Sequence, residues 1–362
     1  MACALVEFDD KLVPAARAFN ERMRAAGGDA SAGFLLPEHA ETGISRLRHY
    51  VVTEGDFIRG GCLLDKRSHW LSGESAEVWN IQAPLSEGMV DRAHASVAIF
   101  MMKTLLKQNP RIYAVGMGSE SSPFARLVKA LGWKLQPVPL LFRVLNGNRF
   151  LREARALREP QWRRRAAEFG YASRLGSVGF RLLHWRMPPA SGQEIEEIGR
   201  FSDVADTLWE KQRSQWVFAS TRDAAALNNL YPPGFRIRRW QLRDGAGWAL
   251  STLTEFQDHH HFGTMRVGTI ADLVAEPERL PVLIEKVVGQ LRADGADLVV
   301  SNQMDPLCQA SLRARGFLQG PSNFLFASSV ALTRAIGAGR VHLNRGDGDG
   351  LIHLATGDHT QR

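Results

Sequence analysis

Hydrophobic positions along the chain follow two periods. Apolar residues recur every three or four positions over 13–26, 89–107 and 280–293, and this spacing predicts amphipathic helices. Short runs rich in β-branched residues separate these segments and predict strands. The runs cover 48–55, 58–67, 77–83, 112–116, 138–145, 235–244, 247–256, 264–274, 298–301 and 322–332. Helices that alternate with strands predict a mixed α/β fold.

Two segments repeat one order of elements. In the first, 111–135, an apolar strand is followed by a polar loop, Pro123 and a helix that ends at Gly132. In the second, 295–318, a proline and a glycine occupy the same places. Proline is tolerated in a first helical turn, and glycine suits the left-handed residue that closes a helix. An amphipathic helix precedes each segment, so we interpret the pair as a duplicated α/β module.

The strand, polar loop and glycine-closed helix of these segments resemble the C-terminal half of the GNAT (Gcn5-related N-acyltransferase) fold. The stretch RDAAALNNLYPP at 222–233 is also similar to a segment of several bacterial GNAT proteins. Two such halves in one chain resemble tandem GNAT proteins, which include the Fem peptidyltransferases and acyltransferases encoded near polysaccharide genes. The resemblance implies two GNAT-like mixed-sheet modules joined by an arginine-rich connector. We therefore predict an N-terminal module over 1–148, the connector over 149–190, a C-terminal module over 191–335 and a Gly/Asp-rich tail over 336–362.

The resemblance also implies an activity. A GNAT-like chain is expected to move an acyl group from acyl-CoA, or from another activated carrier, to an amine acceptor. The polysaccharide-associated members suggest an amino sugar or an amino-acid-like amine, used in cell-envelope or polysaccharide assembly. Acyl-CoA is thus the expected co-substrate and a small-molecule amine the expected partner, and no metal is expected.

Two features of the family are missing from both copies. The Gln/Arg-x-x-Gly-x-Gly/Ala loop, whose backbone N–H groups hold the CoA pyrophosphate, is replaced by PLSEGMVD at 84–91 and by VAEPERLP at 274–281. The tyrosine that often serves as general acid falls on Val128 and Leu312, and neither side chain can donate a proton. These departures favour an alternative function, a catalytically inactive GNAT-like protein that binds a CoA-like ligand or a partner protein.

Polar residues in the second copy mark where chemistry is expected. Asp272 lies on the predicted fourth strand, where it could act as general base or could be a carboxylate paired with an arginine such as Arg266. Asn302 and Gln303 follow the fifth strand, and their amides could orient an acceptor or polarise a carbonyl. By the resemblance, the backbone of the fourth strand binds the pantetheine arm of CoA. The residues concerned are Leu273, Val274 and Ala275.

In the first copy, Ser86 and Gly88 take the place of the glycine-rich loop as donor-binding residues. The N–H groups that begin the next helix could still hold phosphate. Glu87 would oppose the charge of a phosphate, and Gln82 stands where the second copy has Asp272. We therefore predict that the active cleft is in the second copy.

Charge and cysteine content narrow the class of protein. The chain has 45 lysines and arginines against 38 acidic residues, a net charge of +7, which fits an anionic ligand such as CoA and is weak evidence for nucleic acid. The three cysteines are isolated, which indicates reduced thiols and a cytoplasmic location. The N-terminus does not resemble a signal peptide, and no run of about 18 apolar residues predicts a membrane span.

Three further patterns have two interpretations each. The arginine-rich connector, with its run at 163–165, is either a solvated helical link or a basic surface that contacts anionic headgroups or phosphate. The histidines at 259–261 are either an exposed hairpin tip or the source of one acid or base. The Asp-Gly-Asp-Gly run of the tail lacks the ligand positions of a calcium loop. We expect this tail to fold back on the module before it.

Overall fold

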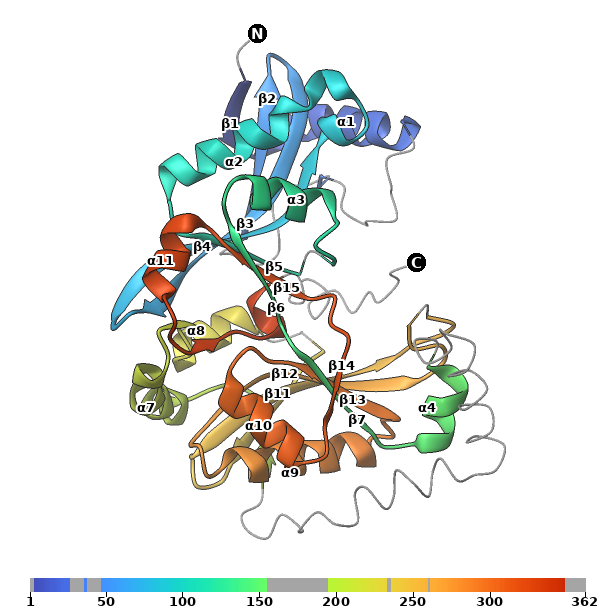
Figure 1. The fold of residues 1–362 in the computed structure, drawn as a ribbon, viewed down its shortest axis with the longest axis vertical. Coiled ribbons are helices and arrows are strands. Elements are labelled where there is room, and N and C mark those ends of the chain that lie inside the picture. Colours follow the sequence, from blue (N-terminus) through green and yellow to red (C-terminus); the bar gives the residue numbers. More distant parts are fainter. Residues whose placement is uncertain are drawn as a thin grey trace. The chain divides into compact units, whose positions relative to one another are not determined.

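The computed structural model describes residues 3–26, 36–37, 47–116, 118–154, 195–232, 236–259 and 261–348. The chain forms two compact units (Figure 1). Unit 1 comprises Met1–Pro137 and Asn323–Ala338, and unit 2 comprises Val138–Ser322 and the segment that begins at Gly339. The structure is a mixed α/β fold with two mixed sheets, as the sequence predicted. Most of the predicted connector, including its arginine run, and the end of the tail lie outside the described residues.

Unit 1 is built on seven strands in the order β1-β2-β3-β4-β5-β15-β6. All neighbours are antiparallel except β4 and β5, which are parallel. The strands are β1 (Cys3–Glu7), β2 (Leu47–Glu54), β3 (Phe57–Leu71), β4 (Glu74–Ser86), β5 (Ile112–Gly116), β6 (Lys134–Pro137) and β15 (Leu325–Ser328). The helices are α1 (Val13–Ala25), α2 (Ser96–Gln108), α3 (Pro123–Ala130) and α11 (Val330–Ile336).

Successive side chains of β2 pack against helices on opposite faces of this sheet. Val51 packs with Phe19 of α1, whereas its neighbours Tyr50 and Val52 belong to the cluster that contains Met101 of α2. This arrangement follows from the two-residue period of a strand, which sends successive side chains to opposite faces. Both faces of the strand are therefore buried, and its hydrophobic run is nearly continuous.

One predicted helix begins later than expected. The pattern predicted a helix from residue 89, but α2 begins at Ser96 after two 3₁₀ turns, η3 (Glu87–Met89) and η4 (Arg92–His94). The side chains of Ser86 and Asp91 each accept a hydrogen bond from the backbone N–H two residues later. These local bonds compete with a continuous helix and hold the chain in separate turns.

The main sheet of unit 2 has seven strands among the described residues, in the order β8-β10-β11-β12-β13-β7-β14. They are β7 (Leu140–Val144), β8 (Ile195–Glu197), β10 (Arg238–Leu242), β11 (Gly247–Glu255), β12 (Arg266–Ala275), β13 (Leu298–Asn302) and β14 (Leu318–Gly320). A short pair outside this path joins β9 (Phe218–Ser220) to β16 (Val341–His342). The helices are α4 (Gly147–Glu153), α7 (Asp203–Gln212), α8 (Ala224–Leu230), α9 (Leu280–Ala293) and α10 (Pro306–Ala314), with a 3₁₀ turn η7 (Arg345–Asp347).

The core of unit 2 also covers both faces of its sheet. Val299 of β13 packs with α9 and α10, while Leu298 and Val300 pack with Phe150 of α4. α10 begins where the sequence predicted, because Asp305 caps Leu307 N–H at 2.8 Å and Pro306 occupies the first turn. The predicted helix over 280–293 is confirmed as α9.

The last strand of each predicted module belongs to the other unit. We expected 138–145 to close the N-terminal module and 322–332 the C-terminal one. Instead β7 pairs with β13 and β14 in unit 2, and β15 pairs with β5 and β6 in unit 1. Each exchanged strand occupies the sixth place of its seven-stranded path. The hydrophobic pattern could not reveal this exchange, because a strand buried on both faces fits equally well into either sheet.

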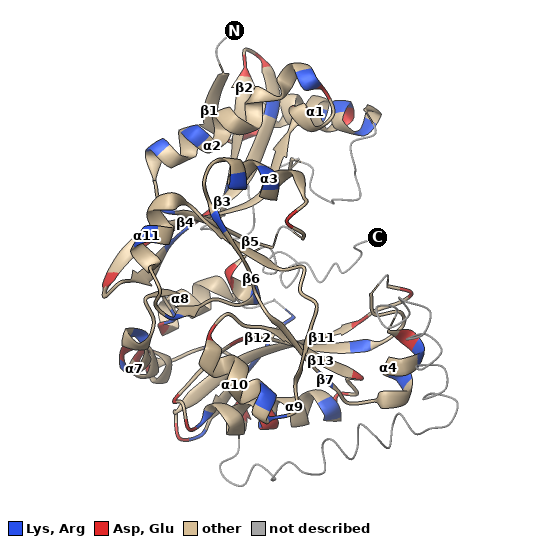
Figure 2. Cartoon of the chain, viewed as in Figure 1, with Lys and Arg blue, Asp and Glu red and all other residues tan. Residues whose placement is uncertain are grey.

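Charged residues are distributed over the helices of both units. Figure 2 shows both signs on α1 and α7, whereas α2 and α3 carry lysine and arginine. Among the described residues, every helix is too short or too polar to cross a lipid bilayer.

Candidate functional site

Each seven-stranded path contains one pair of parallel strands that separate after a short paired stretch. In unit 2, β12 and β13 pair from Val267–Leu298 to Thr269–Val300, and residues 270–275 then continue against β11. In unit 1, β4 and β5 pair at Trp79–Ile112 and Asn80–Tyr113, and residues 81–86 then continue against β3. We call the diverging ends the unit 2 fork (270–275 with 301–302) and the unit 1 fork (81–86 with 114–116).

A β-bulge lies inside each fork. The register of β12 against β11 shifts at Ala271, which is the extra residue between the partners of Leu250 and Ser251. The register of β4 shifts between Gln82 and Leu85, where Ala83 has a φ of 45°. A bulge bends its strand and re-aims the neighbouring groups, and a left-handed alanine is strained by about 1 kcal/mol or more. Both forks are therefore specific features of the backbone.

Asp272 is the centre of a buried polar network in unit 2. Its carboxylate is fully buried and accepts hydrogen bonds from Arg222 Nε at 3.1 Å and from the Tyr231 hydroxyl at 3.1 Å. The side-chain amide of Asn344 donates to its other oxygen, and His342 Nε2 lies 3.5 Å from that oxygen. The structure thus pairs Asp272 with Arg222. The sequence suggested Arg266 as the partner of Asp272, but Arg266 Nη2 lies 3.8 Å from Glu255 Oε2 instead.

Arg222 is shared between two carboxylates. Its Nη2 donates to Asp347 at 2.8 Å, and its Nη1 donates to the carbonyl of Ser220 at 2.8 Å and to the Ser220 hydroxyl at 2.7 Å. Burial alone would lower the pKa of this guanidinium, but the charges of Asp272 and Asp347 outweigh burial and raise the pKa further above its ordinary value. Arg222 is therefore charged, and its charge is shared between the two carboxylates.

The start of the predicted tail takes part in this network, as we expected of a tail that folds back. We call residues 341–347 the tail segment. Its strand β16 pairs in parallel with β9, and its Leu343 carbonyl accepts a bond of 2.9 Å from Met304 N–H. Asn344 forms an isolated bridge with Gln303, in addition to its side-chain bond to Asp272. The tail segment therefore contacts Asp272 of the unit 2 fork and the two residues that follow β13.

The other residues predicted for the second copy lie around the same fork. Gln303 is fully buried, donates to Ser301 Oγ at 3.0 Å and has an Oε1 without a hydrogen-bond partner in the described part of the chain. Asn302 ends β13 opposite Leu140. Leu273, Val274 and Ala275 are buried on β12 and pair with β11.

The predicted donor residues of the first copy belong to unit 1. Ser86 Oγ accepts from Gly88 N–H at 3.2 Å, so this amide is already bonded. Glu87 does not face the fork as an unpaired charge, because it forms ion pairs with Arg22 at 2.7 Å and Arg59 at 3.0 Å. Gln82 is buried and donates to Asn80, and its Oε1 has no hydrogen-bond partner among the residues described.

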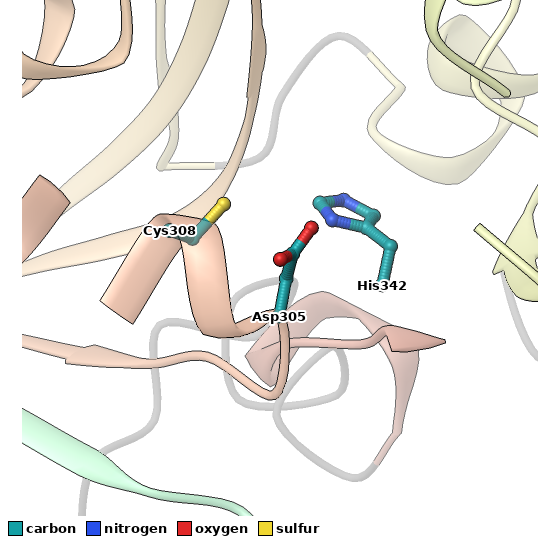
Figure 3. Close-up of side chains that lie close together, drawn as sticks. All are labelled: Asp305, Cys308 and His342. Atoms are coloured by element: carbon teal, nitrogen blue, oxygen red, sulfur yellow. The ribbon is translucent and has the colours of Figure 1, made fainter. Parts of the chain in front are cut away.

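A buried trio with metal-ligand chemistry lies near the tail segment. Figure 3 shows the side chains of Asp305, Cys308 and His342 close together, and their ligand atoms are within 4.8 Å of one another. Asp305 already accepts from Arg340, from Trp216 Nε1 and from Leu307 N–H. These bonds use the acceptor positions that a metal would need. Burial, with the nearby charge of Asp305, raises the pKa of the Cys308 thiol well above its ordinary value.

Sequence reasoning missed most members of the Asp272 network. Arg222 and Tyr231 lie in the stretch 222–233 that we noted for its likeness to GNAT proteins, and Asp347 lies in the Asp-Gly-Asp-Gly run. Both segments were therefore visible in the sequence. What the sequence could not provide was their association, since Asp272 is 50 residues from Arg222 and 72 from Asn344 and no spacing rule links such positions.

Comparison with known proteins gives structural neighbours only. The sequence matches no protein-family model and no curated protein. A GCN5-related N-acetyltransferase from Anabaena variabilis aligns with a TM-score of 0.54 at 11% identity, over 91% of this chain and 73% of that protein. Saccharomyces cerevisiae N-myristoyltransferase with bound myristoyl-CoA aligns with a TM-score of 0.50 at 10% identity, over 90% of this chain and 82% of that protein. A probable N-acyltransferase from Enterococcus faecalis aligns with a TM-score of 0.54 at 9% identity, over 92% and 73%.

At this level of identity the likeness concerns the fold. The chain has the mixed α/β fold of GNAT-type acyltransferases, as the sequence resemblance predicted. Each alignment covers most of both proteins, so the likeness extends over both units of this chain.

Proposed function

We propose that this protein is an N-acyltransferase that moves an acyl group from acyl-CoA, or from another activated carrier, to an amine. The observation that carries the proposal is the bulged fork between two parallel strands, in a fold shared with acyltransferases. A strand that leaves its neighbour exposes backbone groups, which can pair with an extended ligand as an added strand would. The pantetheine arm of CoA is extended and contains amides, so it suits such a site.

The reaction would follow ordinary acyl transfer. The amine nitrogen attacks the carbonyl carbon of the thioester, the C–S bond breaks, and the new amide and a CoA thiol are the products. A proton passes from the amine to the departing sulfur, directly or through a base. Backbone N–H groups at the fork would stabilise the negative charge that develops on the carbonyl oxygen.

We propose that the donor binds at the unit 1 fork. The sequence placed it in the second copy, with Leu273, Val274 and Ala275 against the donor and Asp272, Asn302 and Gln303 as catalytic groups. The contacts of Asp272 favour unit 1, because a fully buried carboxylate that already accepts from Arg222, Tyr231 and Asn344 is poorly placed to take a proton from an acceptor. In unit 1, Ser86 and Gly88 follow the bulge at the end of β4.

The acceptor and the setting come from the sequence resemblance. We propose an amino sugar or amino-acid-like amine in cell-envelope or polysaccharide assembly, in the cytoplasm. All three cysteines are free thiols, which supports a reducing compartment.

The proposal is tested by donor binding and by turnover together. Acyl-CoA donors of different chain length should raise the melting temperature, since a ligand that binds only the folded state stabilises it. With an amine acceptor, release of the CoA thiol should match formation of the amide by mass spectrometry. If no CoA or carrier donor shifts the melting temperature and no amide forms, the protein is a non-catalytic binding protein.

A further inference from the structure

The tail segment supplies an anion to a buried receptor in unit 2. Asp347 is buried, and its carboxylate accepts from Arg222 Nη2 at 2.8 Å, from Asn344 N–H at 3.0 Å and from the hydroxyl of Ser220. A guanidinium, a hydroxyl and a backbone N–H that converge on one carboxylate are the donors of a carboxylate-binding site. Two of these donors, Arg222 and Ser220, lie far from Asp347 in the sequence.

The receptor keeps its shape through contacts that do not involve Asp347. Arg222 is fixed by Asp272 on β12 and by two bonds to Ser220. Ser220 is part of β9, and Asp272 is held in turn by Tyr231. The guanidinium therefore stays in place when the tail carboxylate is removed, and its Nη2 is left without this acceptor. Asp272 still neutralises the guanidinium, but Arg222 Nη2, the Ser220 hydroxyl and Asn344 N–H then lack their common acceptor. Buried donors without an acceptor are costly, so a small carboxylate that replaces Asp347 should be bound.

We propose that Asp347 is a built-in ligand, and that Arg222 and Ser220, beside the unit 2 fork, form a receptor for a small carboxylate that the tail segment occupies. Asn344 of the same segment bonds to Asp272 of the fork and forms a bridge with Gln303, the residue after β13. This proposal uses no acyl chemistry, so its outcome is independent of the proposed function.

The test is chemical rescue of Asp347→Ala by formate. The substitution removes the carboxylate and leaves space for a formate ion beside Arg222. Loss of one partner of a buried ion pair should lower the melting temperature by roughly 10 °C in sodium chloride. Sodium formate at the same ionic strength should restore a substantial part of that loss. For the parent, the melting temperature in formate should equal that in chloride. The same should hold for the control Glu278→Ala, whose side chain is exposed.

Two results would overturn the proposal. An Asp347→Ala variant as stable as the parent in chloride would show that Asp347 is not a ligand of Arg222. A destabilised variant that formate stabilises no better than chloride would show that no carboxylate receptor exists there. If the variant does not fold in chloride, it is refolded from urea in each salt, and its near-ultraviolet circular dichroism spectrum is compared with that of the parent. A native near-ultraviolet circular dichroism spectrum in formate supports the receptor, and failure in both salts contradicts it.

Discussion

In unit 1, β4 leaves β5 after Asn80, and in unit 2, β12 leaves β13 after Thr269. Both outgoing strands contain a bulge, and both stretches beyond the point of separation are equally long, 81–86 and 270–275. The polar residue that lies just beyond the point of separation differs between the two strands. Gln82 bonds to Asn80 on its own strand, whereas Asp272 is bonded to Arg222 and Tyr231 of the stretch 222–233 and to Asn344 of the tail segment.

The comparison shows that similar backbones do not imply similar sites. A fork provides backbone groups in either unit, but the side chains decide what can approach them. In unit 2 a charged network connects the fork to the tail segment, and taking it apart exposes buried charges at high cost. In unit 1 the buried acid near the fork, Glu87, is neutralised by Arg22 and Arg59. We therefore propose that the donor binds in unit 1 and that the network of unit 2 has a structural role.

Removal of Arg222 should have the strongest effect on stability. Arg222→Met leaves Asp272 and Asp347 without their shared cation, and breaking a buried pair in this way costs about 3–5 kcal/mol of unfolding free energy. The matched control is Arg266→Met, because Arg266 is half exposed and its contact with Glu255 is 3.8 Å long. That change should alter the free energy by about 0.5 kcal/mol or less. Equal losses in urea unfolding would mean that Asp272 does not depend on Arg222.

Variants at Asp272 and Gln82 show whether the reaction takes place in unit 1 or in unit 2. If the donor binds in unit 1, Asp272→Asn lowers the melting temperature but leaves turnover close to that of the parent. Gln82→Ala should then raise the KM for the donor about fivefold, the effect of losing one hydrogen bond. Steady-state kinetics with thiol release measures both. A loss of turnover of roughly 10²-fold in Asp272→Asn, with an unchanged melting temperature, would instead identify a general base in unit 2.

Glu87 tests whether charge excludes the donor from unit 1. Burial would raise the pKa of Glu87, but hydrogen bonds and charges from Arg22 and Arg59 prevail and lower it. The ionised carboxylate therefore stabilises the folded state at neutral pH, and this contribution is lost as the pH falls through the lowered pKa. Glu87→Gln should cost about 1 kcal/mol at pH 7, and less in acid.

Donor affinity gives the second measurement on the same variant. Because two arginines already neutralise Glu87, its removal should not tighten CoA binding in titration calorimetry. A clear gain in affinity would show that Glu87 repels the CoA phosphates, as the sequence argument assumed.

Local patterns predicted much of the fold. The helix over 280–293 and the start of α10 follow from apolar spacing and from Asp305 and Pro306, which act within a few residues of the elements that they define. The resemblance to the GNAT fold was confirmed by structures at 9–11% identity. The exchange of β7 and β15 between the units was not predictable in the same way. A strand that is buried on both faces can join either sheet, and its own sequence does not show which.

The candidate site shows the same limit. Asp272 stood out as a carboxylate on an apolar strand, and its pairing with an arginine was one of the two interpretations. The identity of that arginine and the role of Asp347 depend on contacts across 50 and 125 residues of sequence. Such contacts are set by the packing of β9, β12 and the tail segment, and no local spacing encodes them.

Hydrogen–deuterium exchange with bound acyl-CoA locates the donor on the chain. If the donor binds at the unit 1 fork, the backbone amides in 81–88 should exchange more slowly when the donor is added, with unchanged exchange in 270–275 and in the tail segment. Slower exchange in 270–275, accompanied by faster exchange in 341–347, would contradict this placement. That result would mean that the donor displaces the tail segment and binds at the unit 2 fork.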